Sequence, residues 1–141
     1  MRLANIVVAG VLSIGSGVAW SDAPRTNFLL HCAGCHQSDG SGLPDGRVPS
    51  LTANVGYFLE SPAGREFLVR VPGSSQSPLG DQDLADVLNW LLNEFSPQQT
   101  AHHKPYSASE VQELRKRPLD DVAGERRQVR DRLKAQGVDV R

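Results

Sequence analysis

The sequence predicts an all-α protein, in which a small helical domain is followed by a helical C-terminal extension. Apolar residues recur at spacings of three and four between residues 81 and 95, which is the period of an amphipathic helix. Two further helix starts are marked by Ser61, an N-cap residue with a proline directly after it, and by the capping box at 107–110. No stretch gives a convincing strand, and no internal repeat is present.

The first 19 residues are typical of a secretory signal peptide. Arg2 supplies the positive charge, an apolar and glycine-containing run extends from Leu3 to Val18, and Ala19 provides a small residue before the cut. The apolar run is shorter than the roughly 20 residues that span a bilayer, so an uncleaved anchor is the weaker alternative. We expect export to the periplasm, with no membrane association after cleavage.

Residues 32–36 read Cys-Ala-Gly-Cys-His, the attachment pattern of c-type haem. Thiols three positions apart on one helical turn can each form a thioether with one haem vinyl group, and the histidine then lies beneath the porphyrin. A zinc site would need further ligands, but Cys32 and Cys35 are the only cysteines in the chain. A thioredoxin-like motif would need a βαβ context. The pattern predicts one covalent haem c, with His36 at its iron.

The segments on either side of this motif read as helices and loops. Residues 24–31 form a helix with Phe28 on the same face as Cys32, and residues 38–46 form a glycine-rich loop. At Pro49 an extended backbone can offer a carbonyl to the proximal imidazole, which would fix the ring. A short helix is expected at 54–59, a helix with an apolar stripe beginning at Pro62, and a loop at 72–80 before the helix that carries Trp90. Phe28 is expected to pack in the core, and Trp90 is expected to pack against the haem-bearing helix.

The extension follows an expected linker near Pro97 and differs from the preceding part in charge as well as in pattern. Residues 20–97 hold nine acidic and four basic side chains, whereas residues 98–141 hold seven acidic and ten basic ones. The formal net charge of −1 indicates neither a nucleic-acid partner nor a membrane partner. The last helix should start at Asp120 or Asp121 and bury a narrow stripe of Val122, Val129 and Leu133. Its basic face is either solvated or a docking surface. We expect the extension to fold back on the acidic haem domain.

These features, in this order, resemble a class I monohaem cytochrome c over roughly residues 24–95, within an expected haem domain of residues 24–97. The resemblance rests on Phe28 before the attachment motif, the glycine loop, Pro49, and the helix that bears Trp90. It implies thioethers at Cys32 and Cys35, a proximal ligand at His36, and support for that ligand from the Pro49 carbonyl.

One position departs from the family pattern. The family normally supplies a distal Met from a Met-Pro pair, and this chain has Val71-Pro72 there and no Met besides Met1. The iron is then five-coordinate with Val71 over it, or it takes a ligand from the extension, or His31 reaches it, which is the weakest option. The extension offers His102 and His103, with Lys104 and Tyr106 beside them.

The predicted function is single-electron transfer in the periplasm, without catalytic activity, because no nucleophile constellation is visible. The expected partner is a redox protein, either a periplasmic dehydrogenase or a terminal oxidase chain. The alternatives are a haem-based ligand-binding or sensing module, a weak peroxidase with an open distal iron site, and a structural subunit docked by its basic tail.

Overall fold

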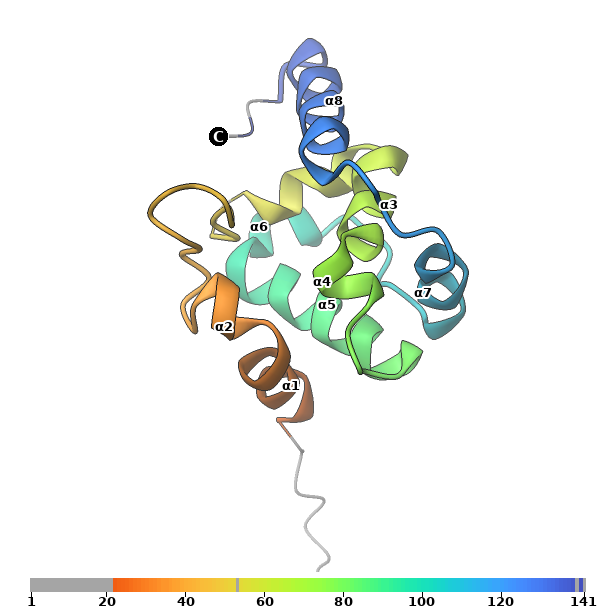
Figure 1. Cartoon of the computed structure of the whole chain (residues 1–141). Coiled ribbons are helices and arrows are strands. Elements are labelled where there is room, and N and C mark those ends of the chain that lie inside the picture. The colour runs from red at the N-terminus through yellow and green to blue at the C-terminus, as the bar shows by residue number, and fades with distance from the viewer. Residues whose placement is uncertain (1–21, 53, 139, 141) are drawn as a thin grey trace, which may run out of the picture.

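The structure is a computed structural model that describes residues 22–52, 54–138 and 140. Its elements are α1 (Ala23–His31), α2 (Ala33–His36), the 3-10 helix η1 (Val55–Glu60), α3 (Pro62–Arg70), α4 (Pro72–Ser75), α5 (Asp81–Phe95), α6 (Pro97–Thr100), α7 (Ala108–Arg115) and α8 (Val122–Ala135) (Figure 1). No strand occurs within these residues, so the all-α prediction is confirmed. The predicted signal peptide, residues 1–19, lies outside the described residues. Within the described part, no helix has the length and apolarity that a membrane span needs.

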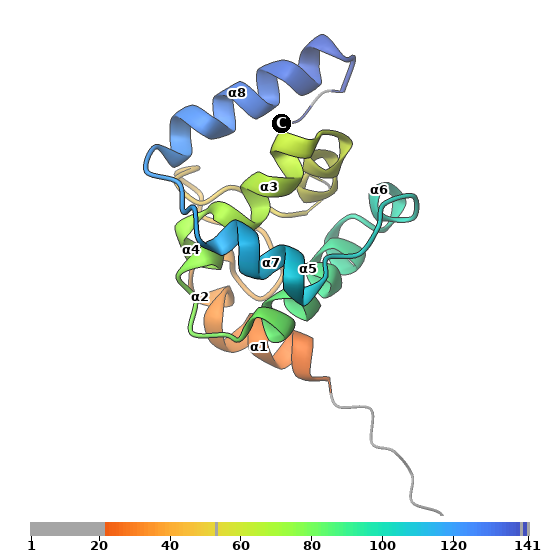
Figure 2. The same cartoon turned by 90° about the vertical axis from the view of Figure 1, so that its right-hand side faces the viewer.

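Helix α5 is the centre of the main hydrophobic core. It begins at Asp81, as the sequence predicts, and α1 and α7 pack against it (Figure 2). Phe28 of α1 is fully buried, with its ring centroid 5.2 Å from that of Trp90 and 5.6 Å from that of Phe95. The expected packing of Phe28 and Trp90 between these two helices is therefore confirmed. The apolar stripe of α5 is buried at Leu84, Ala85, Val87, Leu88, Leu91 and Leu92.

A close contact between η1 and α3 fixes the next part of the chain. The hydroxyl of Ser61 caps α3 by accepting a hydrogen bond from the Gly64 amide at 3.1 Å. A Cβ atom at position 64 would collide with the carbonyl of Phe58, so glycine is what permits the two helices to approach. The short helix expected at 54–59 is present as the 3-10 helix η1.

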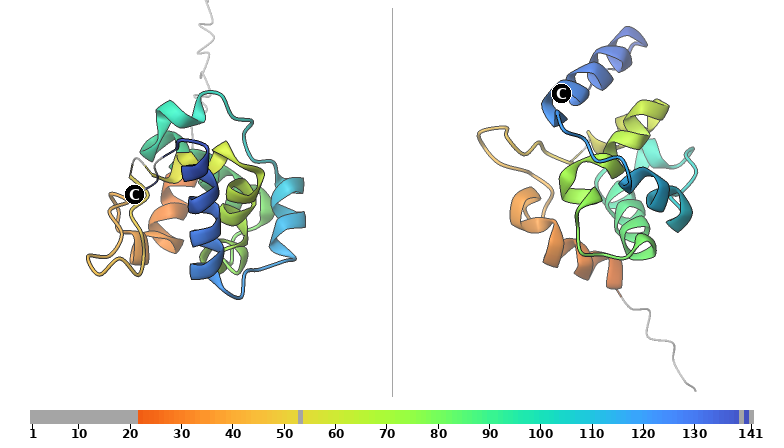
Figure 3. Two further views of the ribbon diagram at one scale, coloured as in Figure 1. Left: turned by 90° about the horizontal axis from the view of Figure 1, so that it is seen from above. Right: turned by 45° about the vertical axis from the view of Figure 1, so that its right-hand side comes forward.

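The C-terminal extension packs on the rest of the molecule through two cores. Helix α7 adds Tyr106 from its approach segment, and Val111 and Leu114, to the main core. Helix α8 crosses η1 and α3 at one end of the molecule (Figure 3). There it builds a second core that consists of Phe58, Phe67, Leu119, Val129, Leu133 and Val140. The stripe predicted for the last helix is thus buried, with Val129 and Leu133 at 2% and 0% exposure.

Both helices of the extension begin with the predicted side-chain caps. The Ser107 hydroxyl accepts from the Glu110 amide at 3.3 Å, and Asp121 accepts from the Gly124 amide at 2.8 Å. The reciprocal half of the capping box does not form, because the Glu110 carboxylate binds Arg65 instead.

Two segments expected to be irregular contain short helices. In the predicted loop 72–80, Pro72–Ser75 forms α4, because Pro72 fits a first helical position and the Ser75 hydroxyl donates to the carbonyls of Arg70 and Val71. At the expected linker near residue 97, Pro97–Thr100 forms α6. Ser96, just before it, is buried and its hydroxyl accepts from the Gly56 amide at 3.1 Å.

Candidate haem-attachment site

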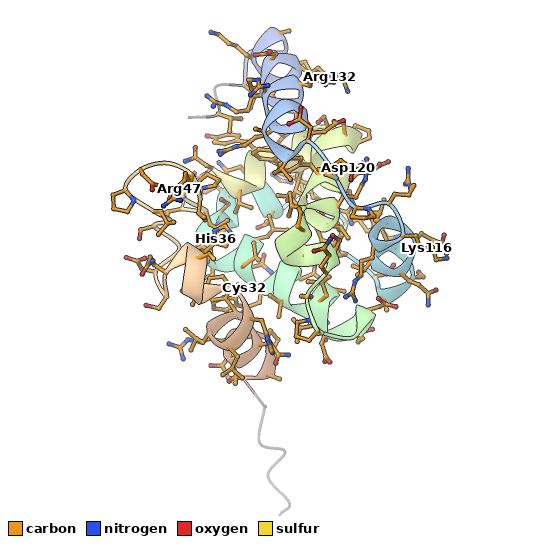
Figure 4. All side chains as sticks on the ribbon, in the orientation of Figure 1. Cys32, His36, Arg47, Lys116, Asp120 and Arg132 are labelled. Atoms are coloured by element: carbon orange, nitrogen blue, oxygen red, sulfur yellow. The ribbon has the colours of Figure 1, made fainter. Side chains whose placement is uncertain are left out.

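The two cysteines lie on a single turn where α1 gives way to α2. The Cys32 amide donates to the carbonyl of Phe28 at 2.8 Å, and the Cys32 carbonyl accepts from the amides of Cys35 and His36 at 3.2 and 3.0 Å. These bonds place both thiols and the imidazole on consecutive turns of helix, where Figure 4 labels Cys32 and His36. Cys32 is half-buried against the main core, and Cys35 is exposed. One anchored and one accessible thiol on one turn suit attachment of a bulky planar group.

The state of Cys32 argues against a redox-active cysteine pair. Burial raises the pKa of the Cys32 thiol. Redox-active pairs depend on a lowered thiol pKa, which is provided by a helix N-terminus or by neighbouring cations. The environment of Cys32 therefore raises the pKa of its thiol, whereas disulfide exchange requires a lowered thiol pKa.

The ring of His36 is half-buried and faces the backbone at Pro49. Burial lowers the pKa of His36, and the backbone carbonyl of Pro49 acts against that shift. The Nδ1 atom is shut off from solvent, yet it completes no hydrogen bond of standard geometry within the described residues. A neutral imidazole whose Nδ1–H is turned toward a carbonyl presents Nε2 as its lone-pair donor, the arrangement that a metal-ligating histidine needs. The residues present thus fit a haem.

The glycine-rich loop returns the chain from His36 to Pro49. The Gly42 amide donates to the His36 carbonyl at 3.0 Å, and the Leu51 amide donates to the Gly40 carbonyl at 2.8 Å. Gly40 and Gly42 have φ angles of 73° and 74°, which favour glycine. A Cβ atom at Gly40 would meet the Phe95 ring at 2.9 Å, and one at Gly42 would meet the backbone at Pro49 at 2.7 Å. These glycines therefore set the approach of Pro49 to His36.

Val71 caps the C-terminal end of α3 and is half-buried against the second core. Its amide donates to the Phe67 carbonyl at 3.1 Å, and its carbonyl accepts from the amides of Ser74 and Ser75 in α4. An isopropyl side chain has no atom that can coordinate iron.

The residues of the extension considered as distal ligands have other surroundings. His102 is exposed, and His103 lies with Nε2 3.3 Å from a Glu60 carboxylate oxygen. Lys104 is exposed as well, while Tyr106 is buried and its hydroxyl donates to the carbonyl of Arg65 at 2.7 Å. His31, at the end of α1, is also exposed. No contact among the described residues brings either His102 or His103 to His36.

Two arginine clusters tie the extension to the segments around Val71, and sequence reasoning missed both. Arg65 of α3 binds both carboxylate oxygens of Glu110 at 2.6 and 2.8 Å and stacks over the Tyr106 ring at 4.0 Å. Arg115 of α7 binds the segment between α4 and α5. The partners in each cluster are separated by more than 30 positions in the chain, so no local sequence pattern predicts these contacts.

Comparison with known proteins identifies the family to which the chain belongs. No protein-family model matches the chain. The chain is 31% identical over 134 residues to a cytochrome c-552 of Thermus thermophilus, a match that covers 80% of this chain and 90% of that protein. It is 33% identical over 128 residues to a second Thermus thermophilus cytochrome c-552, covering 76% of this chain and 97% of that protein.

A third relative is only partly covered. The fructose dehydrogenase cytochrome subunit of Gluconobacter japonicus is 31% identical over 101 residues, which cover 60% of this chain and 20% of that protein. The matches to the two shorter relatives are long enough to include part of the C-terminal extension, because 80% of the chain exceeds what residues 1–97 contain. On the identity and coverage of these matches, the chain belongs to the c-type cytochromes, which transfer electrons through covalently attached haem c.

Proposed function

We propose that this chain is a periplasmic carrier of single electrons in which Cys32 and Cys35 hold the haem and His36 is its proximal ligand. The observation that carries this proposal is the placement of both thiols and a neutral, Pro49-facing imidazole on one pair of helical turns. When bound, haem supplies an iron that cycles between its ferrous and ferric states. The proposed domain division, residues 24–97 for the haem and residues 98–141 for the extension, follows from the position of this site.

The protein itself orients the His36 ring and excludes water from the attachment site. The Pro49 carbonyl, which the buried Nδ1 of His36 faces, would hold the His36 ring in one orientation and raise its donor strength when haem is bound, as hydrogen-bonded carbonyls do for metal-bound histidines. The main core covers Cys32 and its neighbours through Phe28 and Trp90. Export to the periplasm is proposed from the signal peptide at residues 1–19, and it agrees with haem attachment outside the cytoplasm.

A periplasmic dehydrogenase or an oxidase chain is the proposed redox partner. Support for a dehydrogenase comes from the similarity to a protein named as the cytochrome subunit of fructose dehydrogenase. Fructose is named for that protein alone, and the proposal assigns no substrate to the partner of this chain.

The attachment test is chemical. Haem should remain with the polypeptide after acid-acetone extraction, and the alkaline pyridine spectrum should match two thioethers. Cys32→Ala and Cys35→Ala should each leave a single thioether with the corresponding shift of the pyridine spectrum, and His36→Ala should abolish normal ligation while the thioethers remain. Complete extraction of haem from the unmodified protein would contradict the proposal.

The alternative function is a ligand-binding module or weak peroxidase, and Val71 is the observation that favours it. Rapid carbon monoxide binding to the ferrous protein is expected for an open distal site. Val71→Met should introduce a thioether ligand, produce a low-spin spectrum and slow carbon monoxide binding. If the unmodified protein binds no carbon monoxide, an internal ligand already occupies the distal position and the module reading fails, whereas the carrier reading stands.

A further inference from the structure

Arg126 on α8 differs from the other half-buried arginines of the described residues. There are four of these, and in three the Nε atom donates to a protein oxygen. Nε of Arg126 is shut off from solvent and has no acceptor among the described residues. The three satisfied bonds run from Arg65 to Glu110 at 2.6 Å, from Arg70 to the Arg117 carbonyl at 2.7 Å, and from Arg115 to the Ser75 carbonyl at 3.0 Å.

The charge of Arg126 is uncompensated as well. Burial lowers the pKa of Arg126, and the neighbouring guanidinium of Arg130 lowers it further. In the described part of the chain, none of the ion pairs involves a cation of α8, while the arginines of α3 and α7 all have carboxylate partners. Holding a guanidinium partly out of water beside a second cation costs free energy unless an anion meets it.

The position of Arg126 on the helix directs it toward the body of the molecule. It lies four residues after Val122 and three before Val129, and both of these valines pack in the second core. That core joins α8 to Tyr57 and Phe58 of η1 and to Val71 at the end of α3. Arg126 therefore belongs to the face of α8 that covers the segments on either side of the proposed haem site.

The chemistry of the cofactor supplies an anion at this end. The vinyl groups that form thioethers and the two propionates lie on opposite edges of the porphyrin. Figure 4 shows Cys32 at the α1–α2 end of the molecule and Arg132 on α8 at the other end, and Figures 1 and 2 show the same separation of α8 from α1 and α2. A haem attached at Cys32 and Cys35 would have its propionate edge on the side away from these cysteines, which is the side of the molecule where α8 lies.

We propose that Arg126 binds a haem propionate, so that the C-terminal extension completes the cofactor site. This inference rests on the proposed attachment at Cys32 and Cys35. The carboxylate would satisfy the Nε donor and offset the charge of Arg126 and Arg130, and charge-assisted bonds of this kind are stronger than neutral ones. A cation held near the iron also favours the ferrous state over the ferric state.

The test compares Arg126→Gln with Arg127→Gln in the full-length haem protein. Arg127 is the adjacent, exposed arginine, so both variants lose one formal charge from the same helix. With ¹³C-labelled propionates, the carboxylate stretching bands at pH 7 should shift in Arg126→Gln and stay in place in Arg127→Gln. The reduction potential should move to a more negative value in Arg126→Gln by more than it does in the control. Arg126→Lys should restore part of both changes.

A direct measurement covers the case in which Arg126→Gln disturbs α8. The ferrous protein is diamagnetic when its iron is six-coordinate, with carbon monoxide added if the distal site is open. Nuclear Overhauser contacts between the Arg126 guanidinium protons and the propionate methylene protons are expected in the unmodified protein. Absence of these contacts, or equal band positions in Arg126→Gln and Arg127→Gln, would overturn the inference. A protein without covalent haem would instead fail the extraction test, which identifies failure of the proposed function itself.

Discussion

Tyr106 connects the extension to two helices of the preceding part through one side chain. Its backbone is held by Asn89 of α5, whose amide side chain accepts from the Tyr106 amide at 2.8 Å and donates to the Tyr106 carbonyl at 3.0 Å. Its hydroxyl donates to the Arg65 carbonyl at 2.7 Å, and the Arg65 guanidinium covers the ring. Burial raises the pKa of Tyr106 far above its ordinary value, and the cation of Arg65 offsets only part of this shift.

The raised pKa of Tyr106 predicts an alkaline limit to stability. The fold holds the phenol of Tyr106 in its neutral form. The free energy of unfolding that this neutral phenol contributes is therefore complete below the unfolded pKa of about 10, and it is lost as the pH rises above that value. Tyr106→Phe should cost about 1 kcal/mol at pH 7, through the lost hydrogen bond, and should flatten the decline above pH 10. Urea unfolding followed by far-ultraviolet circular dichroism between pH 7 and 11 measures both effects. Parallel declines in the two proteins would assign the alkaline loss to another group.

At the scale of elements, Arg115 of α7 clamps the segment between α4 and α5. Its Nε donates to the Ser75 carbonyl at 3.0 Å and Nη2 donates to the Ser77 carbonyl at 2.7 Å. Its Nη1 donates to the Leu79 carbonyl at 2.8 Å and pairs with Asp81 at 3.0 Å. This one guanidinium satisfies three backbone carbonyls directly after Val71-Pro72, the pair that stands where the family's distal ligand pair is expected.

We expect Arg115→Ala to loosen this segment without dissolving the fold. Loss of several charge-assisted bonds should lower the free energy of unfolding by about 2–3 kcal/mol. Amide hydrogen exchange should accelerate at residues 76–80 and remain slow in the middle of α5. Lys116→Ala is the matched control, because Lys116 is the next residue and makes only an exposed pair with Glu113. Equal losses of stability in the two variants would show that the clamp is not what holds the segment.

The elements divide into those that local patterns predict and those that distant contacts create. The stripe of α5, the N-caps at Ser61, Ser107 and Asp121, and the haem motif each depend on residues within a few positions of one another, so the sequence predicts them. The features that the sequence does not predict depend on contacts between residues far apart in the chain. Helix α4 depends on the Ser75 hydroxyl and is clamped by Arg115, and Glu110 leaves its own cap to bind Arg65, 45 positions away.

The candidate site shows the same division. The cysteines and His36 lie within five consecutive residues, and the resemblance to class I cytochromes c pointed to Pro49, whose role beside His36 stays a prediction. Arg126 gives no sequence signal, because its neighbours on α8 are also basic and only burial distinguishes it from them. The sixth ligand stays a prediction, since Val71 cannot coordinate and the extension's histidines have other surroundings.

At the scale of the whole molecule, the acidic and basic halves are joined mainly by apolar burial. In two ion pairs between the extension and the haem domain, Arg115–Asp81 and Arg117–Glu66, the extension supplies the cation, as its net charge predicts. In Arg65–Glu110 the haem domain supplies the cation instead. Of these pairs Arg117–Glu66 is exposed, and exposed pairs contribute about 0–1 kcal/mol each. Burial of an aliphatic side chain contributes about 1.5–3 kcal/mol, so Val129 and Leu133 alone outweigh such pairs.

Two truncations should therefore behave differently. Removal of residues 98–141 takes Tyr106, Val111 and Leu114 out of the main core, together with the Arg115 clamp. We expect that protein to lose cooperative unfolding. Removal of residues 121–141 leaves the main core intact and uncovers Phe58, Phe67 and Val71. This shorter truncation should unfold cooperatively at a lower temperature, as thermal melts followed by circular dichroism would show.

The shorter truncation also tests whether α8 restricts access to the iron. Because α8 packs in the same core as Val71, its removal should speed carbon monoxide binding to the ferrous protein, measured by stopped-flow absorbance. Leu133→Ala is the control, since it weakens the second core by about 2–5 kcal/mol while α8 remains in the chain. A faster rate in the truncated protein with little change in Leu133→Ala would identify α8 as a cover. Equal carbon monoxide rates in the truncated and full-length proteins would show that α8 stabilises the fold without shielding the distal side, and would leave its basic face available to a partner.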